Sequence, residues 1–436
     1  MFVTESNDHY PVIIIGSGPA GMSVASELIG KHGVQSILLL ESGDLTYDAE
    51  LNELSEVTAL GDLPASHYAI HAIRAFGGTS LVWAGLCGVL EPMSFDNGEW
   101  PFSRETLLPF YERAISILEL PDNSVVDDVA PINSDSLINY RPVYLSKPVK
   151  FGEKYLQFAR ESSKLDVMLK STVSRIDHDG SAVKGVTLAT GRSIRADKVV
   201  LACGGVGNPR LLLQSGLDAG GQVGLRLMEH AHVYDHNLAV IWGDAITSSL
   251  NGSGVRVNAF SMNERWLRER SLRSFLMSTG PRKDEGLPPN TDGGVVRAHW
   301  TLQAEMLPLE DNRVTLGKQL DSLGQPRAEV NFHFPAAEVL ETLWRKAGVQ
   351  FLRENVGRFS LSASVSEIAG GGHLMGTTRM GLSGDGCVDE NSEFYGCRNL
   401  FVAGSSVFPS GGAINPTFTI VALSLKLADH IAGRIS

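Results

Sequence analysis

The hydrophobic pattern at the start of the chain predicts a strand, a turn, a helix and a second strand in direct succession. Residues 12–15 form an apolar run without polar alternation, which is typical of a strand buried on both faces of a sheet. A helical pattern follows from Met22 to about Ile29, and residues 36–40 form the next apolar strand, which ends at Glu41. This order of elements indicates a parallel sheet covered by helices.

The chain returns to this sheet further along. Residues 167–173 predict a strand, and turns at 179–180 and 190–191 separate the strands that follow. The apolar run 199–205 ends in glycines and is typical of a strand in the centre of a sheet. A helix over 208–214 begins there, with a proline in its first turn. These elements therefore extend the first sheet.

The C-terminal part adds a strand over residues 399–406 and a helix that runs to about Ala432. Asn415 suits the N-cap of this helix, and Pro416 suits its first position. The helix is apolar almost all the way round. We therefore expect it to be buried, with the positive end of its dipole directed at an anionic group.

The middle of the chain shows a different pattern, because residues 295–306 alternate between polar and apolar side chains. This alternation predicts an antiparallel strand with one polar face. That face either lies in solvent or lines a cavity for a hydroxyl-rich ligand, and the pattern leaves both interpretations open. Its polar members are Arg297, His299, Thr301, Gln303 and Glu305.

The turn between the first strand and the first helix has the spacing of a dinucleotide-binding fingerprint. Gly16 permits the tight turn, Gly18 lets the backbone approach a pyrophosphate, and Gly21 lets the helix pack closely on the strand. The phosphates would meet free N–H groups at the positive end of the helix dipole. Glu41, 20 residues after Gly21, can accept hydrogen bonds from both ribose hydroxyls.

The remaining glycines indicate that separate segments return to one cofactor. The chain carries no second fingerprint for NAD(P). Its glycine content is nevertheless high, at 46 of 436 residues. Eleven of these glycines fall between Gly370 and Gly412, where about three would be expected at the average rate. Several chain segments are therefore expected to approach the same dinucleotide closely.

Composition and charge argue against several classes of protein. Lys and Arg number 37 against 49 Asp and Glu, and the resulting net charge of −12 disfavours a nucleic-acid role. The four cysteines show no metal-binding spacing, and no apolar run approaches the roughly 20 residues that cross a bilayer. The first ten residues lack the basic flank and apolar core of a signal peptide, so a cytoplasmic location is the default expectation.

The C-terminal part carries the most specific motifs. Three stretches resemble the glucose-methanol-choline (GMC) family of FAD oxidoreductases: His-Leu-Met-Gly-Thr-Thr-Arg-Met-Gly from His373, Ala-Gly-Ser-Ser-Val-Phe-Pro from Ala403, and Asn-Pro-Thr-Phe-Thr-Ile-Val-Ala-Leu from Asn415. Together with the fingerprint and the Gly77-Gly78 loop, the resemblance covers most of the chain in order. The chain is most similar to the pyranose-oxidase and sugar-dehydrogenase branch of the family.

The resemblance implies an α/β fold, α+β overall. A Rossmann-like FAD-binding domain would be assembled from discontinuous segments, and a substrate domain would carry a mainly antiparallel sheet. The FAD-binding domain is expected to comprise residues 1–95, 165–235 and 366–436. The substrate-binding domain is expected to comprise residues 96–164 and 236–365.

The resemblance also implies roles for individual residues. His373 matches the catalytic histidine, which takes the proton of the substrate hydroxyl while flavin N5 takes the hydride. Asn415, 42 residues later, matches its partner and would hold the substrate oxygen. FAD is expected to be non-covalent, because Val82 stands where pyranose oxidases carry a histidine bonded to FAD. The implied cofactor-binding residues are Gly16, Gly18, Pro19, Ala20, Gly21, Glu41, Gly77, Gly78, Thr79, Ser80, Trp83, Ala84, Gly85, Val173, Ala202, Gly204, Gly404, Ser405, Asn415, Pro416 and Thr417.

The implied activity is the FAD-dependent oxidation of a hydroxyl group on a sugar, a glycoside or another polyhydroxylated alcohol. Gln303 and Glu305 would then bind the substrate. The electron acceptor stays open between oxygen, a quinone and a redox protein. The alternatives are an FAD-containing lyase of the hydroxynitrile type, without net redox chemistry, and a flavin-binding protein without catalysis. No metal site is expected, since His230 and His232 match a structural stretch of the family.

Overall fold

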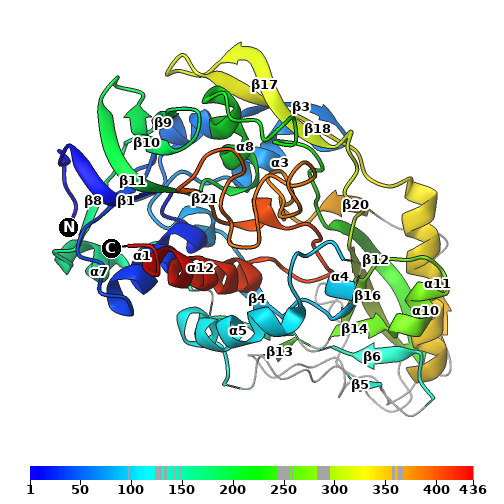
Figure 1. The fold of residues 1–436 in the computed structure, drawn as a ribbon. Helices are drawn as coiled ribbons and strands as arrows, with labels where there is room; N and C mark the ends of the chain where they lie inside the picture. The colour runs from blue at the N-terminus through cyan, green and yellow to red at the C-terminus, as the bar shows by residue number, and fades with distance from the viewer. Residues whose placement is uncertain are drawn as a thin grey trace.

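A computed structural model of the chain confirms the expected fold class (Figure 1). It contains a largely parallel sheet with helices packed on it and a second, mainly antiparallel sheet. The residues that the structure describes are 1–96, 98–122, 130–131, 135–141, 143–147, 149–242, 256–257, 259–281, 295–355, 359–361 and 367–435.

The first sheet is built from strands that are far apart in the sequence. β1 (His9–Ile15) lies at its centre, because it pairs in parallel with β2 (Ile37–Leu40) on one side and with β11 (Ser193–Leu201) on the other. β8 (Leu165–Met168) extends the sheet beyond β2, and β21 (Leu400–Val402) pairs in parallel with the end of β11. The predicted return of the chain to the central sheet is therefore confirmed for β11, and the strand predicted over residues 399–406 is β21, which joins the same sheet.

The predicted strand over residues 167–173 is wrong, because the chain turns within it. β8 ends at Met168, and β9 (Val173–His178) begins a hairpin with β10 (Val183–Leu188). Lys170 between them has a left-handed backbone with φ of +53°. This local turn is invisible to hydrophobic periodicity because the residues on both sides of it are apolar.

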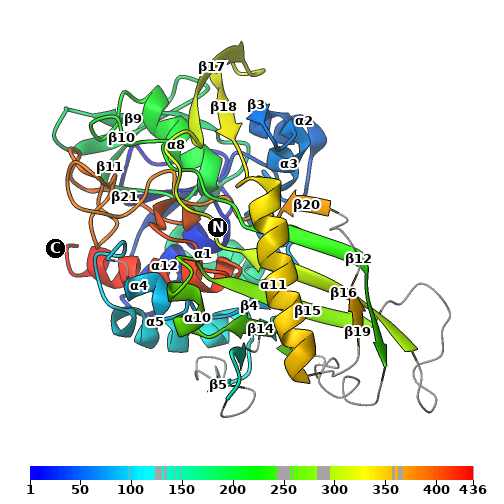
Figure 2. The ribbon, with the colours of Figure 1, turned by 90° about the vertical axis from the view of Figure 1, so that its right-hand side faces the viewer.

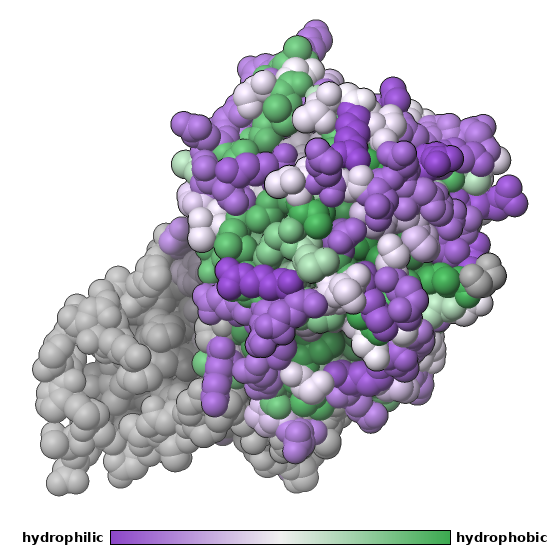
Figure 3. Space-filling model, turned by 90° about the vertical axis from the view of Figure 1, so that its left-hand side faces the viewer, coloured by the Kyte–Doolittle hydropathy of each residue, from purple (hydrophilic) through white to green (hydrophobic). Residues whose placement is uncertain are grey.

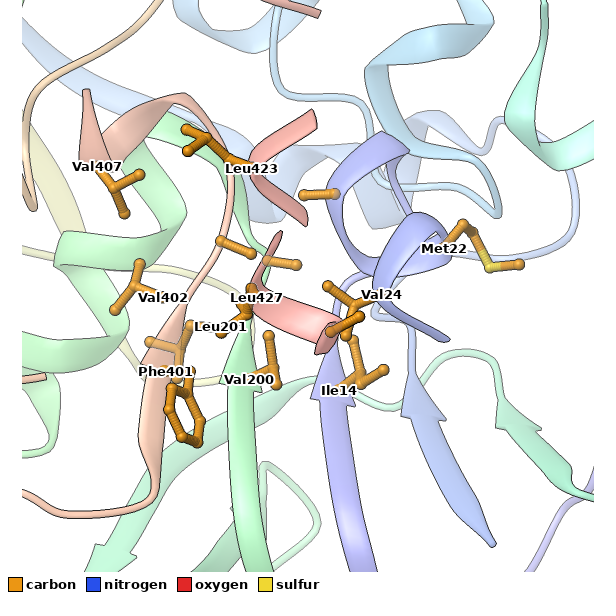
Figure 4. Close-up of a cluster of buried hydrophobic side chains, with 14 of the residues drawn as sticks. Ile14, Met22, Val24, Val200, Leu201, Phe401, Val402, Val407, Leu423 and Leu427 are labelled. Carbon is orange, nitrogen blue, oxygen red and sulfur yellow. The ribbon is translucent and has the colours of Figure 1, made fainter. Parts of the chain in front are cut away.

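Two helices pack on the first sheet and bury the apolar side chains that lie between the helices and the sheet. α1 (Pro19–Gly30) follows the glycine turn, and α12 (Thr417–Ala432) is the last helix, buried as predicted. α5 (Arg104–Leu118) packs on α12, where the Tyr111 hydroxyl lies 2.6 Å from the Thr419 hydroxyl. Figure 4 shows the resulting cluster, which includes Ile14, Met22, Val24, Val200, Leu201, Phe401, Val402, Val407, Leu423 and Leu427.

The helix predicted over residues 208–214 starts earlier. α8 spans Gly204–Gln214, so Pro209 lies in its interior and has no N–H for the carbonyl of Gly205. The Thr377 hydroxyl donates to that carbonyl instead, at 2.6 Å. A long-range hydrogen bond thus compensates for the proline, and sequence rules that place proline in the first turn could not detect it.

The second sheet confirms the antiparallel strand predicted around residues 295–306. β16 (Val295–Ala304) pairs with β12 (Ala231–Trp242) and β15 (Phe275–Pro281), and α11 (Ala337–Asn355) lies across the sheet (Figure 2). The side chains of residues 295–300, which include Arg297 and His299, lie outside the described part of the chain. The other strands of this sheet are β14 (Ala259–Met262), β6 (Ile138–Tyr140), β5 (Ala130–Pro131), β19 (Phe359–Leu361) and β20 (Glu367–Gly370).

Smaller elements connect these two sheets. Two small sheets comprise β17 (Arg313–Leu320) with β18 (Pro326–Phe332) and β3 (Val57–Gly61), and β13 (Arg256–Val257) with β7 (Val143–Leu145) and β4 (Leu86–Cys87). The short helices are α2 (Ala49–Asn52), α3 (Ala65–Ile70), α4 (Met93–Asp96), α6 (Phe151–Lys154), α7 (Leu156–Glu161) and α10 (Glu264–Arg268), with 3₁₀ turns η1 (Glu53–Ser55), η2 (Gly78–Leu81) and η3 (Ser405–Val407).

Two apolar cores accompany the two large sheets. The side chains of Trp100, Tyr111 and Phe151 belong to the core of the first sheet, although residues 96–164 are expected in the substrate-binding domain. The expected domain boundaries stay a prediction. The surface seen from the left of Figure 1 is largely polar, with smaller apolar areas between the polar side chains (Figure 3). Among the described residues, no helix has both the length and the apolar character needed to cross a membrane.

We expect Gly205→Ala to destabilise the protein more than Gly30→Ala. Both glycines lie in helices, but a Cβ on Gly205 would sit 2.5 Å from the carbonyl oxygen of Leu374, whereas a Cβ on Gly30 would meet nothing within 4 Å. Overpacking costs about 1–3 kcal/mol, while alanine in an open helical position gains up to about 1 kcal/mol over glycine. The urea midpoint of unfolding measures the difference. Equal midpoints for the two variants would contradict the close contact.

Candidate active site

Bare backbone from two chain segments meets at the start of α1. A Cβ on Gly78 would lie 2.9 Å from the Cα of Gly18, and Gly78 has a left-handed backbone with φ of +57°. Gly18 is the N-cap residue of α1, and within the described part of the chain no side-chain hydrogen bond caps this helix. The N–H groups of the first turn are therefore available to an anion. This arrangement fits the pyrophosphate of a dinucleotide.

A hydrogen-bond chain holds the second segment against the first. The Ser17 hydroxyl donates to the Glu41 carboxylate at 2.6 Å and accepts the N–H of Gly77 at 3.0 Å. The Ser80 hydroxyl donates to the carbonyl of Gly77 at 2.6 Å. Glu41 also accepts the N–H of Gly43 at 2.8 Å, so both of its oxygens have protein partners. The structure thus places Glu41 at the expected end of β2, where its carboxylate orders the loops.

The rest of the second segment is held mainly by its own neighbourhood. The Thr79 hydroxyl donates to the carbonyl of His71 at 3.2 Å, and the indole N–H of Trp83 donates to the carbonyl of Val149 at 3.0 Å. The carbonyl of Gly85 accepts the N–H of Ser146 at 2.8 Å. Ala84 and Val82 are exposed on the same loop. The hydroxyl of Thr79 is therefore engaged in shaping the loop.

The third and fourth segments also approach through small residues. A Cβ on Gly16 would lie 2.5 Å from the carbonyl oxygen of Ala202, and a Cβ on Gly404 would lie 4.0 Å from the Cβ of Ala20. The Ser405 hydroxyl donates to the carbonyl of Leu374 at 2.7 Å. The expected approach of several glycine-containing segments is thus present in the backbone at Gly16, Gly18, Gly78 and Gly404. Of the other predicted residues, Pro19 and Gly21 lie in α1, Val173 at the start of β9, and Gly204 at the start of α8, and their role in cofactor binding stays a prediction.

His373 and Asn415 lie together, as the resemblance implies. The amide Nδ2 of Asn415 is 3.0 Å from Nε2 of His373. The prediction that Asn415 caps the last helix is wrong by one position, because Pro416 is the N-cap residue and α12 begins at Thr417. The amide of Asn415 contacts the imidazole, and no side-chain hydrogen bond within the described residues caps α12.

Burial and neighbouring histidines keep the His373 imidazole neutral. Burial lowers the pKa of His373 well below 6.5, and repulsion from His230, His232 and His71 lowers the pKa further. The other ring nitrogen, Nδ1, lies 2.8 Å from Nδ1 of His230. A neutral imidazole at neutral pH can accept a proton, which is the property that a general base requires.

A fully buried carboxylate holds the loop that carries His373. Glu229 accepts the backbone N–H groups of Gly372 at 3.0 Å, His373 at 2.6 Å and His230 at 2.8 Å. It also lies 2.9 Å from Nε2 of His67. Burial by itself would raise the pKa of Glu229, but these hydrogen bonds hold the pKa below its usual value. Glu229 is therefore an anion that orders the loop.

The turn before Asn415 is held from the side of the second sheet. Gln303 donates from Nε2 to the carbonyl of Ala413 at 3.1 Å, and Glu91 accepts the N–H of Ala413 at 3.2 Å. Glu305 accepts the N–H of Gly412, and burial, together with the nearby Glu91, raises the pKa of Glu305 to about 8. The structure thus brings Gln303 and Glu305 to the site, where their described contacts are with protein atoms.

Sequence reasoning missed the roles of Glu229, His230 and Glu91. From the sequence, His230 is assigned to a structural stretch and Glu229 is given no role, yet both contact His373 directly. The sequence offers one relevant signal, because His230 and His232 are two residues apart around the start of β12, where alternate residues point to the same side. It offers no signal for Glu91, whose partner Ala413 lies 322 residues away.

Comparisons with known proteins find similarity to one family of oxidoreductases. Models of the GMC oxidoreductase family match residues 147–232 and 308–424. The chain is 24% identical to 2-methyl-1,2-propanediol dehydrogenase of Mycolicibacterium austroafricanum, over 100% of this chain and 97% of the relative. It is 28% identical to C-glycoside 3-oxidase of Microbacterium trichothecenolyticum, over 59% of this chain and 51% of the relative. Among solved structures, pyridoxine 4-oxidase from Mesorbium loti has a similar fold, with a TM-score of 0.63 at 17% identity over 96% of this chain and 98% of that one.

We expect Glu229→Gln to lower stability by about 3–5 kcal/mol at neutral pH, because the variant leaves buried donors without their anion. The folded-state pKa of Glu229 is depressed, so its contribution is present above 4.5, the usual glutamate value, and is lost as the pH falls through the folded-state pKa. The difference in urea midpoint between wild type and variant should therefore shrink below pH 4.5.

The exposed Glu338, at the start of α11, provides the control for this measurement. Glu338→Gln should change the free energy of unfolding by less than about 0.5 kcal/mol at neutral pH and so leave the midpoint almost unchanged. A Glu229→Gln difference that is equally small, or that does not depend on pH, would contradict the role of the carboxylate in ordering the loop.

Proposed function

Because this chain belongs to the GMC oxidoreductase family, whose members bind FAD, we propose that it oxidises a hydroxyl group of a sugar, a glycoside or another polyhydroxylated alcohol. Two relatives support this substrate class, since one is named as a dehydrogenase of a diol and the other as an oxidase of a C-glycoside. The lyase alternative finds no support among these relatives, which are named as oxidising enzymes.

One observation carries the proposal. The neutral imidazole of His373 presents Nε2 next to the amide of Asn415, 3.0 Å away, beside the helix that ends the dinucleotide-binding fold. Oxidation of an alcohol requires a base for the hydroxyl proton. We propose that His373 Nε2 takes this proton and that the amide of Asn415 holds the substrate oxygen while the proton moves.

The glycine segments would hold the cofactor. The first turn of α1, with Gly18, and the loop at Gly77 and Gly78 fit the pyrophosphate, and Glu41 stands at the ribose position of the fingerprint. When bound, FAD supplies the hydride acceptor for the oxidation. Val82 has no nucleophilic group, so this position offers no covalent attachment and the FAD would be non-covalent.

The substrate side of the site would be shaped by the second sheet. Gln303 and Glu305 both reach the turn at Gly412 and Ala413, two residues before Asn415. With the pKa of Glu305 near 8, this carboxyl group is largely protonated at neutral pH and can donate a hydrogen bond. We propose that these two side chains select a hydroxyl-rich substrate. The electron acceptor stays open between oxygen, a quinone and a redox protein.

We expect His373→Ala to slow reduction of the flavin by about 10²–10⁴-fold, because removal of a general base costs this much. Anaerobic mixing of the holoenzyme with candidate sugars, glycosides and diols, followed by the bleaching of the flavin absorbance, measures the rate. His9→Ala, which changes an exposed histidine beside Asp197, is the matched control. Bleaching by the His373→Ala variant at the wild-type rate would refute the base assignment. Product without bleaching would indicate a lyase.

The pH dependence of the reaction gives an independent test. Because the pKa of His373 is lowered well below 6.5, its neutral, proton-accepting form persists as the pH falls through 6.5. We therefore expect kcat/KM, which reports ionisations of the free enzyme, to show no loss assigned to His373 between pH 8 and 6.5. An acid limb with its midpoint at or above 6.5 that depends on His373 would contradict a base with a lowered pKa.

A further inference from the structure

His230 is a fully buried histidine that takes no direct part in the proposed proton and hydride transfer. Its ring contacts protein groups on both sides. Nε2 lies 2.8 Å from the carbonyl oxygen of Gly412, and Nδ1 lies 2.8 Å from Nδ1 of His373. The amide Nε2 of Gln303 also lies 3.2 Å from Nδ1 of His230. These partners determine where the protons are.

The carbonyl of Gly412 can only accept a hydrogen bond, so Nε2 of His230 carries the proton. Burial lowers the pKa of His230 below its usual value, and the ring is therefore neutral at neutral pH, with a single N–H. Nδ1 of His230 must then carry a lone pair. This assignment follows from a backbone group, whose role as an acceptor does not depend on any side-chain orientation.

Gln303 gives the same answer independently. The carbonyl of Ala413 is also only an acceptor, so the Gln303 atom that lies 3.1 Å from it must be the amide nitrogen. The same NH₂ group lies 3.2 Å from Nδ1 of His230 and cannot accept a hydrogen bond from it, so Nδ1 of His230 carries no proton. The contacts with the backbone carbonyls of Gly412 and Ala413 thus lead to the same assignment, in which Nδ1 of His230 is an acceptor.

The consequence reaches His373. Since Nδ1 of His230 accepts, Nδ1 of His373 must donate, and the single proton of the neutral His373 ring therefore lies on Nδ1. Nε2 of His373 is left with the lone pair, on the side that faces the amide of Asn415. The opposite tautomer would place a proton on Nε2 and leave no lone pair there.

We propose that His230 is a positioning residue that holds His373 in its Nδ1–H tautomer and so keeps the Nε2 lone pair free for the substrate proton. This inference rests on the proposed function. When the hydroxyl O–H breaks, its proton forms a bond to Nε2, and His373 becomes a cation with a proton on each nitrogen. The Nδ1–H of His373 remains hydrogen-bonded to the lone pair of His230, which stabilises that cation. The hydride leaves with its electron pair to the bound oxidant, so atoms and charge balance.

The competing explanation is that His230 only anchors the turn at Gly412. Two variants separate the explanations because each keeps one half of the ring. In His230→Asn, the amide oxygen can take the place of Nδ1 and accept from His373, and the donor Gln303 favours that orientation. In His230→Gln, the amide nitrogen can take the place of Nε2 and donate to Gly412, but the acceptor for His373 is lost.

The first measurement is the tautomer itself. Holoenzyme with ¹⁵N-labelled histidine is examined by long-range proton–nitrogen correlation without substrate, and the signals of His373 are identified by their loss in His373→Ala. We expect an Nδ1–H pattern for His373 in the wild type and in His230→Asn, and a changed pattern in His230→Gln. An Nε2–H pattern in the wild type would overturn the proposal, whether or not either variant folds.

The second measurement is anaerobic flavin reduction. We expect His230→Gln to lose about 10²–10⁴-fold in the limiting rate, as for loss of a general base, with substrate KM less affected, and His230→Asn to lose less than about tenfold. The reverse order would indicate that the contact with Gly412 matters and would overturn the proposal. If none of the alcohols tested reduces the flavin of the wild-type enzyme, the proposed function is refuted. The tautomer spectrum would still test the role of His230.

Discussion

The carboxylate of Glu229 is the group on which the geometry of the candidate site depends. It is fully buried and accepts backbone N–H bonds from His230 and from Gly372 and His373, whose loop lies 143 residues further along the chain. Buried N–H groups need an acceptor, and a carboxylate offers several lone pairs at one place. The contacts of His373 with His230 and with Asn415 presuppose this anchoring.

The site also limits unpaired charge in its interior. Glu229 is hydrogen-bonded to His67 and to three backbone N–H groups, Glu91 is paired with Arg141, and Glu305 is largely protonated at neutral pH because burial raises its pKa to about 8. The imidazole of His373 is neutral for the same reason, since burial disfavours a charged form. A base in such surroundings is able to accept a proton at neutral pH, and its hydrogen-bond partners decide which nitrogen accepts it.

Sequence reasoning predicted the parts of the site that depend on local motifs. The glycine turn at Gly16, the Gly77-Gly78 loop and the pair His373 and Asn415 all carry recognisable residues at recognisable spacing, and the structure places His373 and Asn415 3.0 Å apart. The errors lie where a distant group changes a local preference. Pro209 is tolerated inside α8 because the Thr377 hydroxyl donates a hydrogen bond to the carbonyl of Gly205, which the proline nitrogen cannot do.

By itself, the sequence determined the order of strands and helices, the dinucleotide fingerprint and the resemblance to the GMC oxidoreductase family, because these depend on hydrophobic period and on motifs read within a few residues. Only the tertiary structure decided which groups meet His373. The ring of His230 bonds a carbonyl 182 residues away, at Gly412, and Glu91 bonds Ala413 across 322 residues. Hydrogen bonds of this kind are set by how distant segments pack, and no local pattern of residues encodes them.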